Sequence, residues 1–345
     1  MKLKSLVMAL AASVAAAGTV SAQQITGAGA TFPAPVYAKW AEGARSGANI
    51  ELNYQAIGSG GGINQITNRT VDFGASDAPL AGDKLASGKL LQFPTVMGAV
   101  VPIVNIPGVE PDQLKLTGEL LADLYLGKIT KWNDPRLVEA NRGVSLPNLA
   151  VAPVYRADGS GTTFVFASYL SAVSSDWKGK VGAATSIRWP VGTGARGNDG
   201  VAATVRNTRG AVGYVEYAYA HVNKLTTAQL RNKAGNYVRA SSETFAAAAS
   251  SADWTGAQNF AVDLIDQAGA QAWPIVSATF ILLPTNPTDA ARSRNVMRFF
   301  DWAYTNGGAA AEELDYIPLP ANVQDAVRAA WQKNLVADGK PIWSR

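Results

Sequence analysis

The chain has 345 residues, 48% of them hydrophobic, and a formal net charge of only +4 at pH 7. This length predicts about two domains with ordinary hydrophobic cores. With no cysteine and one histidine, the chain lacks a disulfide framework and the usual zinc ligands, so we expect no metal and no cofactor. No basic cluster with interleaved aromatic residues is present, which excludes the charge pattern of a nucleic-acid-binding protein.

Residues 1–22 have the pattern of a secretory signal peptide. Lys2 and Lys4 precede an apolar core from Leu6 to Ala17, and small residues follow at the cleavage point, up to Ala22. The core is too short to span a bilayer, and prolines interrupt the later apolar run from Val96 to Val109. We therefore expect export to the periplasm, without a lipid anchor because no cysteine follows the cleavage point.

Three segments carry glycines and a hydroxyl residue into the start of a helix. They contain Thr31 (within Gly27 to Pro33), Ser59 (after the alternating strand Ile50 to Ala56), and Ser160 and Thr162 (after the apolar stretch Leu149 to Val154). Helix N-termini carry unpaired N–H groups and a positive dipole, so they bind anions. Each segment alone fits an ordinary capped helix. Three together, one with Arg156, favour a small anion bound between converging N-termini.

Asp77 lies in the segment from Val71 to Pro79, where a short strand meets a turn. One interpretation is that its carboxylate stabilises the turn before Pro79. The other is that it faces a ligand. The segment alone leaves both interpretations open.

Strands alternate with helices along the chain, which predicts an α/β protein with mostly parallel sheets. Two apolar runs, Thr95 to Val104 and Trp273 to Leu283, could cross between two lobes. In such sheets, ligands bind beyond the carboxyl ends of the strands. The predicted helices are Pro33 to Arg45, Gly118 to Leu126, Thr162 to Val173, Asp199 to Asn207, Glu243 to Ala249, Asp289 to Tyr304 and Ala321 to Leu335.

A competing motif is the G-x-G-x-x-G match from Gly192 to Gly197, which follows a possible strand from Ile187 to Val191. Glu216 lies roughly where a ribose-binding acid would be. Pro190 interrupts the strand, and an exported protein meets few dinucleotides, so we favour a glycine-rich surface loop. The single His221 has no serine in its sequence context, which predicts a surface or helix-terminal histidine.

The mature chain resembles the periplasmic phosphate-binding proteins of bacterial ABC-type phosphate importers over essentially its whole length. The segments that carry the resemblance are Ile25 to Tyr37, Val71 to Pro79, Arg156 to Thr162, Gly197 to Gly200 and Gly213 to Tyr219. The resemblance implies a two-lobed, hinged α/β binding protein of type II-like fold, with two crossovers. Lobe I would comprise residues 23–96 and 274–345, and lobe II residues 97–273.

The resemblance also implies the phosphate ligands. They are Thr31, Phe32 through its backbone N–H, Ser59 and Asp77 from one lobe, and Arg156, Ser160, Gly161 and Thr162 from the other. Asp158 matches the acid that pairs with the arginine. Tyr155 replaces a second basic residue of some relatives, which predicts a weaker field at the mouth of the cleft. A buried Asp77 carboxylate would accept a hydrogen bond from the O–H that phosphate keeps and sulfate lacks.

The expected function is therefore a high-affinity, non-catalytic receptor that delivers inorganic phosphate to the transmembrane permease subunits of an ABC importer, acting as a monomer. One alternative is an exported phosphatase or phosphotransferase that uses the same residues. Another is a surface-exposed adhesion or stress protein. The sequence shows no positioned nucleophile, base or metal set, which weighs against the enzyme.

Overall fold

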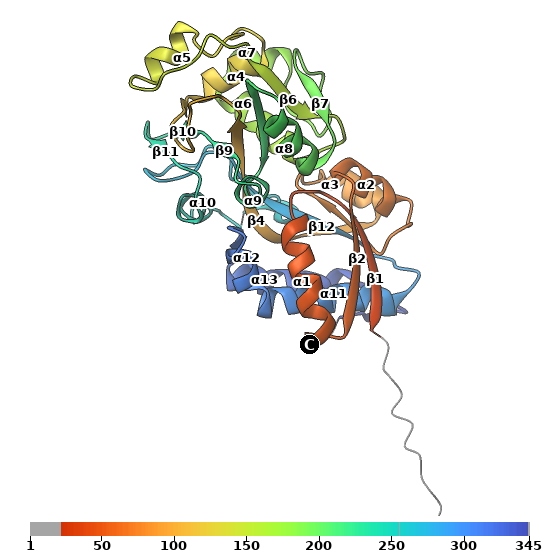
Figure 1. The fold of residues 1–345 in the computed structure, drawn as a ribbon. Helices are drawn as coiled ribbons and strands as arrows, with labels where there is room; N and C mark the ends of the chain where they lie inside the picture. The colour runs from red at the N-terminus through yellow and green to blue at the C-terminus, as the bar shows by residue number, and fades with distance from the viewer. Residues whose placement is uncertain (1–21, 255, 344–345) are drawn as a thin grey trace, which may run out of the picture.

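A mixed β-sheet runs through both halves of the molecule and carries the strands that connect them (Figure 1). The computed structural model describes residues 22–254 and 256–343. Apart from Ala22, the predicted signal peptide at residues 1–22 lies outside the described residues. The strands follow the order β2-β1-β3-β12-β4-β8-β6-β7, and β13 and β9 also pair with β4.

Lobe I is built around β1 (Gln23–Gly29), which pairs in parallel with β2 (Ile50–Ala56) and β3 (Phe73–Ser76). Between β1 and β2 runs α1 (Ala34–Gly47), and between β2 and β3 runs α2 (Ser59–Thr67). The buried side chains of α1 recur at helical spacing, which explains how one of its faces packs on the sheet. Because the three strands are parallel, the residues that follow them lie at one edge of the sheet.

Lobe II repeats this arrangement around β6 (Ala152–Arg156), which pairs in parallel with β7 (Thr193–Ala195) and β8 (Ala211–Glu216). β6 leads into α6 (Gly161–Val173), and β7 leads into α8 (Gly197–Asn207). The start of both helices therefore lies at the carboxyl edge of the lobe II strands.

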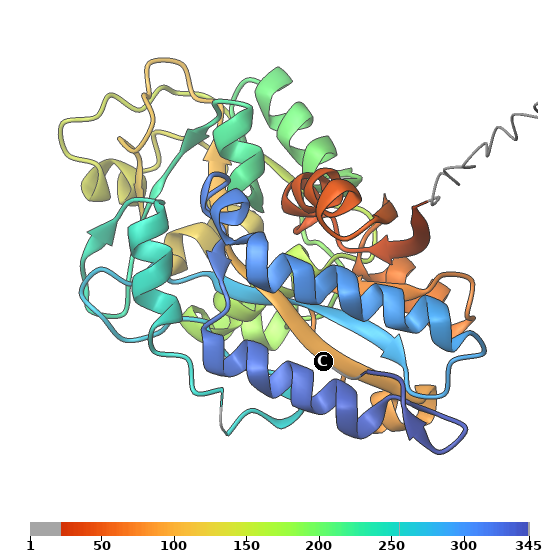
Figure 2. The same cartoon turned by 90° about the horizontal axis from the view of Figure 1, so that it is seen from below.

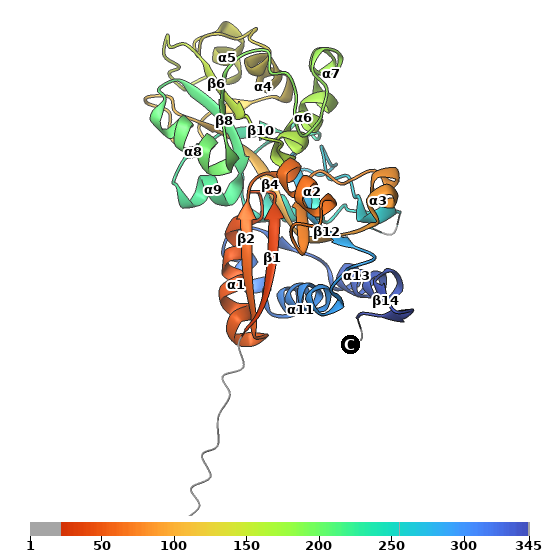
Figure 3. The same ribbon diagram turned by 90° about the vertical axis from the view of Figure 1, so that its right-hand side faces the viewer.

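Two long strands connect the lobes. The first, β4 (Leu90–Val104), pairs antiparallel with β12 (Val276–Pro284) as far as Ala99 and then with β8 from Val100 onward. The predicted run from Thr95 to Val104 lies within β4, and the run from Trp273 to Leu283 lies in β12 from Val276 onward. Figure 2, seen from below, shows α11 (Ala290–Asn306) and α13 (Ala321–Asn334) running along β4 and β12, and in Figures 1 and 3 both helices lie below these strands. In Figure 3 the two lobes lie one above the other, with these strands at their junction.

All seven predicted helices are present, with ends close to the predicted ones. The possible strand from Ile187 to Val191 was wrong: the strand is β7, which begins at Thr193, beyond the interrupting Pro190. Among the described residues, no helix is both long and apolar enough to cross a membrane. The remaining elements are α3 (Gly82–Gly88), α4 (Gly118–Tyr125), α5 (Pro135–Ala140), α7 (Ser175–Lys180), α9 (Tyr217–Val222), α10 (Ser242–Ala249), η1 (Gln258–Phe260), α12 (Gly308–Glu312), β5 (Lys115–Leu116), β9 (Thr226–Thr227), β10 (Gln229–Arg231), β11 (Tyr237–Val238), β13 (Ile317–Pro318), β14 (Val336–Ala337) and β15 (Lys340–Pro341).

Candidate anion-binding site

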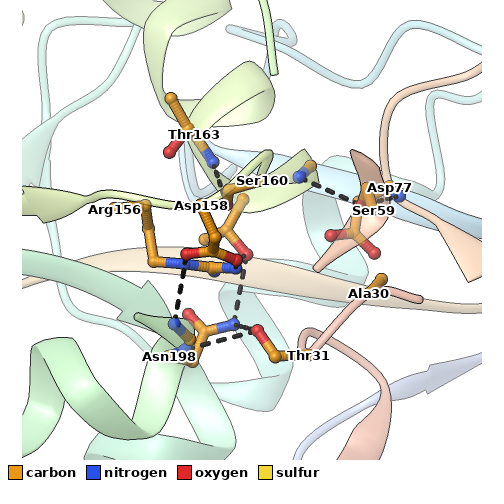
Figure 4. Close-up of polar contacts among 12 residues, drawn as sticks. Ala30, Thr31, Ser59, Asp77, Arg156, Asp158, Ser160, Thr163 and Asn198 are labelled. Carbon is orange, nitrogen blue, oxygen red and sulfur yellow. Dashed lines mark hydrogen bonds and ion pairs between the residues drawn. The ribbon is translucent and has the colours of Figure 1, made fainter. Parts of the chain in front are cut away.

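Polar side chains from both lobes meet where α2, α6 and α8 begin (Figure 4). Figure 4 shows Ser59 and Asp77 on one side, Arg156, Asp158 and Ser160 on the other, and Thr31 beside Asn198. Among these side chains only Asp158 is partly exposed; the others are buried.

The N-termini of α2 and α6 touch across the lobes. Ser59, the first residue of α2, accepts hydrogen bonds at Oγ from the backbone N–H of Gly161 (3.0 Å) and of Asp77 (3.3 Å). Gly60 N–H donates to the Gly159 carbonyl at 2.9 Å. Gly58, before Ser59, has φ of 89°, in the region that favours glycine. Two predicted helix starts therefore converge on one place.

The four hydroxyls of the predicted site are all used as hydrogen-bond acceptors. Thr31 Oγ1 accepts from Asn198 Nδ2 at 2.8 Å, and Ser160 Oγ, the N-cap of α6, accepts from Thr163 N–H at 3.0 Å. Thr162 Oγ1 accepts from Arg156 Nη1 at 3.3 Å. Ser59 accepts as described above. Within the described residues none of these hydroxyls donates, so each keeps its hydrogen for a further acceptor.

Arg156 is held by a bidentate pair with Asp158. Its Nε lies 2.7 Å from Asp158 Oδ1 and its Nη2 lies 2.5 Å from Oδ2. Burial would raise the pKa of Asp158, but the hydrogen bonds and charge of Arg156 hold that pKa below its usual value. Asp158 Oδ1 also accepts from Gly197 N–H at 3.2 Å. Of the five guanidinium N–H groups, the Asp158 and Thr162 contacts leave two for another partner.

Asp77 is 1% exposed, and its two oxygens have different surroundings. Oδ1 accepts a hydrogen bond from Thr279 Oγ1 at 2.8 Å, whereas Oδ2 has no partner among the described residues. Burial raises the pKa of Asp77 to about 7, although Thr279 and the charge of Arg156 act in the opposite direction. Oδ2 lies beside the N-terminus of α6, because a Cβ on Gly161 would fall 2.5 Å from it.

Phe32 is joined to the site through its backbone. Its ring is buried in the core, and its carbonyl accepts a hydrogen bond from Tyr316 OH at 2.6 Å. The preceding Thr31 carbonyl accepts from Tyr219 OH at 2.6 Å. These contacts fix the turn between β1 and α1 on which both predicted residues lie.

Asn198 is a site residue that the sequence analysis did not identify. Its Nδ2 donates to Thr31 Oγ1 and, at 3.1 Å, to Thr162 Oγ1, so one amide orients a hydroxyl from each lobe. The sequence did contain one indication of its importance, because Asn198 lies in the segment from Gly197 to Gly200, one of those that carry the family resemblance. The structure thus brings together all eight predicted ligand residues and Asp158, and adds Asn198.

The G-x-G-x-x-G match, predicted as a surface loop, is in part regular structure: residues Thr193–Ala195 form β7, and Gly197 begins α8, where its N–H contacts Asp158. His221 is on the surface, with its side chain 59% exposed and its Nδ1 2.6 Å from Asp315 Oδ2, as its sequence context predicted. Glu216 is fully buried, so its carboxyl group could not bind the ribose of a dinucleotide held at the surface by the glycine-rich segment. Among the described residues no group of three or more His, Cys, Asp or Glu side chains is placed to hold a metal ion.

Beside the site, a cavity of about 330 Å³ is lined by Thr31, Ala56, Ile57, Asp158, Arg196, Gly197 and Asp199. It reaches Thr31 and Asp158 from the side where Arg196 is exposed. The cavity therefore connects the buried polar residues with solvent.

Comparison with known proteins identifies the family. A family model described as a PBP superfamily domain matches residues 14–306. The chain is 49% identical over 326 residues to the phosphate-binding protein PstS of Pasteurella multocida, covering 94% of this chain and 95% of the relative. It is 35% identical over 320 residues to the phosphate-binding protein PstS of Methanocaldococcus jannaschii, covering 86% and 82%. The chain belongs to the PstS family of the PBP superfamily.

Solved structures agree with the fold of this PstS family member. A high affinity periplasmic phosphate-binding protein (PfluDING) bound with phosphate has a TM-score of 0.74 at 23% identity, covering 92% of this chain and 96% of the other. A phosphate-binding protein from Stenotrophomonas maltophilia has a TM-score of 0.67 at 23% identity, covering 89% and 93%. At this identity the likeness establishes the two-lobed fold alone.

Proposed function

We propose that the protein is a high-affinity receptor for inorganic phosphate that delivers it to the permease subunits of an ABC importer. The names of its PstS relatives support this function. The observation that carries it is a buried site that, among the described residues, has four free hydroxyl hydrogens, two free guanidinium N–H groups, and one unpartnered carboxylate oxygen, Oδ2 of Asp77. Such a site matches an anion that keeps a proton.

The proposed ligands divide into donors and one acceptor. Asp77 Oδ2 accepts the phosphate O–H, and a fully ionised sulfate would meet it with unrelieved repulsion. Arg156 supplies the positive charge, oriented by Asp158. The other donors are Thr31, Ser59, Ser160, Thr162 and the backbone N–H groups of Phe32 and Gly161. Gly161 N–H, which donates to Ser59 Oγ here, would exchange that partner for a phosphate oxygen.

The remaining parts of the proposal concern organisation and location. Lobe I comprises residues 23–96 and 274–345, lobe II comprises residues 97–273, and the chain acts as a monomer. Residues 1–22 direct export to the periplasm and are removed. The protein is not an enzyme and binds no nucleic acid. The family's transport role supports the non-enzymatic function, as does the surface position of His221.

A titration of the purified mature protein with phosphate and with sulfate, followed by tryptophan fluorescence, tests the proposal. Saturable binding of phosphate, with sulfate at least about a hundredfold weaker (~2.8 kcal/mol), is expected. Equal binding of both anions, or of neither, would contradict it. Phosphate release from common phosphate esters that is abolished by Arg156→Ala would instead favour the exported phosphatase.

A further inference from the structure

A second buried carboxyl group lies at the junction of the lobes, outside the proposed set of phosphate ligands. Glu216 ends β8, opposite Val100 of β4, and is fully buried. It has no ion-pair partner among the described residues, and its Oε1 has no hydrogen-bond partner there. Its Oε2 accepts from Ala218 N–H at 2.9 Å as the N-cap of α9. A buried acid without a cation is costly to ionise.

The contacts of Tyr316 call for a proton on Glu216. The Tyr316 hydroxyl oxygen lies 2.6 Å from the Phe32 carbonyl oxygen and 2.8 Å from Glu216 Oε2. Tyrosine has one hydroxyl hydrogen, and a carbonyl has none, so two well-aligned hydrogen bonds need a second hydrogen. A carboxylic proton on Oε2 supplies it: Glu216 donates to Tyr316, and Tyr316 donates to Phe32.

This chain of hydrogen bonds connects lobe II with the turn that carries Thr31 and Phe32. On its other side, the backbone N–H of Glu216 donates to Asn198 Oδ1 at 3.0 Å. The Nδ2 of that amide donates to Thr31 Oγ1. Glu216 therefore touches two groups, Tyr316 of lobe I and Asn198 of lobe II, that each hold a part of the Thr31–Phe32 turn.

The surroundings of Glu216 agree with a neutral acid. Burial raises its pKa well above the usual value, although the contacts with Tyr316 and Ala218 act in the opposite direction, and the negative charge of Asp77 in lobe I raises it further. Burial also keeps the pKa of Tyr316 well above its usual range, so that hydroxyl stays a donor. The other titratable groups that interact with Glu216 are Tyr217 and Tyr219 of its own helix, α9.

We propose that Glu216 is a positioning residue of the anion site that works as a neutral carboxylic acid, holding the Thr31–Phe32 turn through Tyr316 and Asn198. The positioning role rests on the proposed phosphate binding, whereas the protonation state does not. As a neutral group, Glu216 links the lobes without adding negative charge beside a bound anion.

The protonation state is tested by carbon-13 NMR of the mature protein labelled at the glutamate carboxyl carbons, with no phosphate added. One resonance is expected to keep the chemical shift of a protonated acid at neutral pH and to disappear in Glu216→Gln. If every glutamate resonance at neutral pH has the shift of a carboxylate, the proposal is wrong. This readout is meaningful whether or not the protein binds phosphate.

The positioning role is tested by phosphate titration of three variants. Glu216→Ala and Tyr316→Phe are each expected to weaken binding about tenfold, since each breaks the link to Phe32. Glu216→Gln should restore part of the loss, because its Nε2, placed where Oε2 lies, can donate to Tyr316, although it cannot accept from Ala218 N–H. A Gln variant as weak as the Ala variant would contradict the neutral-acid role.

Tyr304→Phe is the matched control for Tyr316→Phe. Tyr304 is also a buried tyrosine, and its hydroxyl donates to the Pro94 carbonyl, outside the anion site. Its loss should lower the melting temperature and leave phosphate affinity unchanged. If both tyrosine variants lower the phosphate affinity equally, the loss of affinity comes from general destabilisation, and the proposed positioning role is wrong. Absence of phosphate binding by the unmutated protein would remove the proposed function and this role, but not the protonation state.

Discussion

Asp77 and Asp158 are carboxylates in one site with opposite environments. Both oxygens of Asp158 meet the Arg156 guanidinium, which holds its pKa down despite burial. Asp77 has one hydroxyl partner and, within the described part of the chain, one free oxygen, and burial raises its pKa to about 7. These environments suit the proposed roles, in which Asp158 orients the cation and Asp77 accepts a hydrogen bond from the phosphate O–H.

Asp77→Asn should reduce selectivity for phosphate over sulfate. Thr279 donates to Oδ1, so the asparagine places its Oδ1 there and turns Nδ2 toward the position of the free oxygen. An N–H donor then replaces an acceptor, which relieves the repulsion of sulfate. We expect the ratio of phosphate to sulfate affinity to drop at least about tenfold (~1.4 kcal/mol) in competition titrations at fixed pH and salt. An unchanged ratio would show that selectivity resides elsewhere in the cleft.

The raised pKa of Asp77 also predicts a pH dependence of stability. The folded state holds a proton on Asp77 that the unfolded state, with a pKa near 3.8, releases earlier as pH rises. Folding stability contributed by this proton is complete below about pH 4 and is lost as pH rises toward 7, by up to about 1.4 kcal/mol per pH unit. When the free energy of unfolding of the phosphate-free protein is measured by denaturant at several pH values, its decrease with pH over this range should be smaller in Asp77→Asn than in the unmutated protein. Parallel curves for the two proteins would contradict the prediction.

Arg156→Ala should weaken phosphate binding more than Thr31→Ala or Ser160→Ala. The guanidinium is buried and carries the positive charge of the site, and its loss leaves Asp158 without its cation. We expect a loss of about 3 kcal/mol or more, against about 1 kcal/mol for each hydroxyl. Calorimetry of the three variants gives the order. Any other order would remove Arg156 from its proposed role.

Among the elements, the start of α6 is crowded, because it meets α2 and the residue that follows β3 in the other lobe. A Cβ on Gly161 would lie 2.5 Å from both Asp77 Oδ2 and Ser59 Oγ. Gly161→Ala should therefore hold the lobes apart and weaken phosphate binding at least about tenfold (~1.4 kcal/mol). Gly179→Ala on α7 is the control, since nothing lies within 4 Å of its Cβ position. Equal phosphate affinity for the two variants would contradict the crowding argument.

At this scale, the sequence predicted the helices whose starts carry local signals. A serine directly before an apolar helix predicts an N-cap, and the hydroxyl of Ser160 does accept a hydrogen bond from Thr163 N–H. Contacts between residues far apart along the chain left no such signal. Asn198 orients Thr31, 167 residues away along the chain, and Tyr316 reaches Phe32, 284 residues away. The local sequence pattern cannot show which residues at such separations are in contact. The set of ligand residues was therefore predicted from the family resemblance, and that set did not include Asn198.

At the scale of the molecule, the two lobes share one sheet, yet their polar contacts at the site are few. The sheet passes from lobe I to lobe II where β4 leaves β12 at Ala99 and joins β8 at Val100. A rotation about this junction would separate Ser59 from Gly161 and Thr31 from Asn198 without disturbing the parallel strands inside either lobe. The fold therefore allows a hinge at the place where the proposed ligands are divided.

Phosphate should accordingly shift the protein toward a more closed arrangement. A ligand can favour closure only by binding the closed form more tightly, and a phosphate held by Asp77 from one lobe and Arg156 from the other does so. Solution scattering should give a smaller radius of gyration with saturating phosphate than without it, and sulfate at the same concentration is the control. In Gly161→Ala the decrease should be smaller, because the added Cβ opposes closure. Equal radii with and without phosphate in the unmutated protein would mean that the lobes stay fixed and that phosphate enters through the cavity beside Arg196.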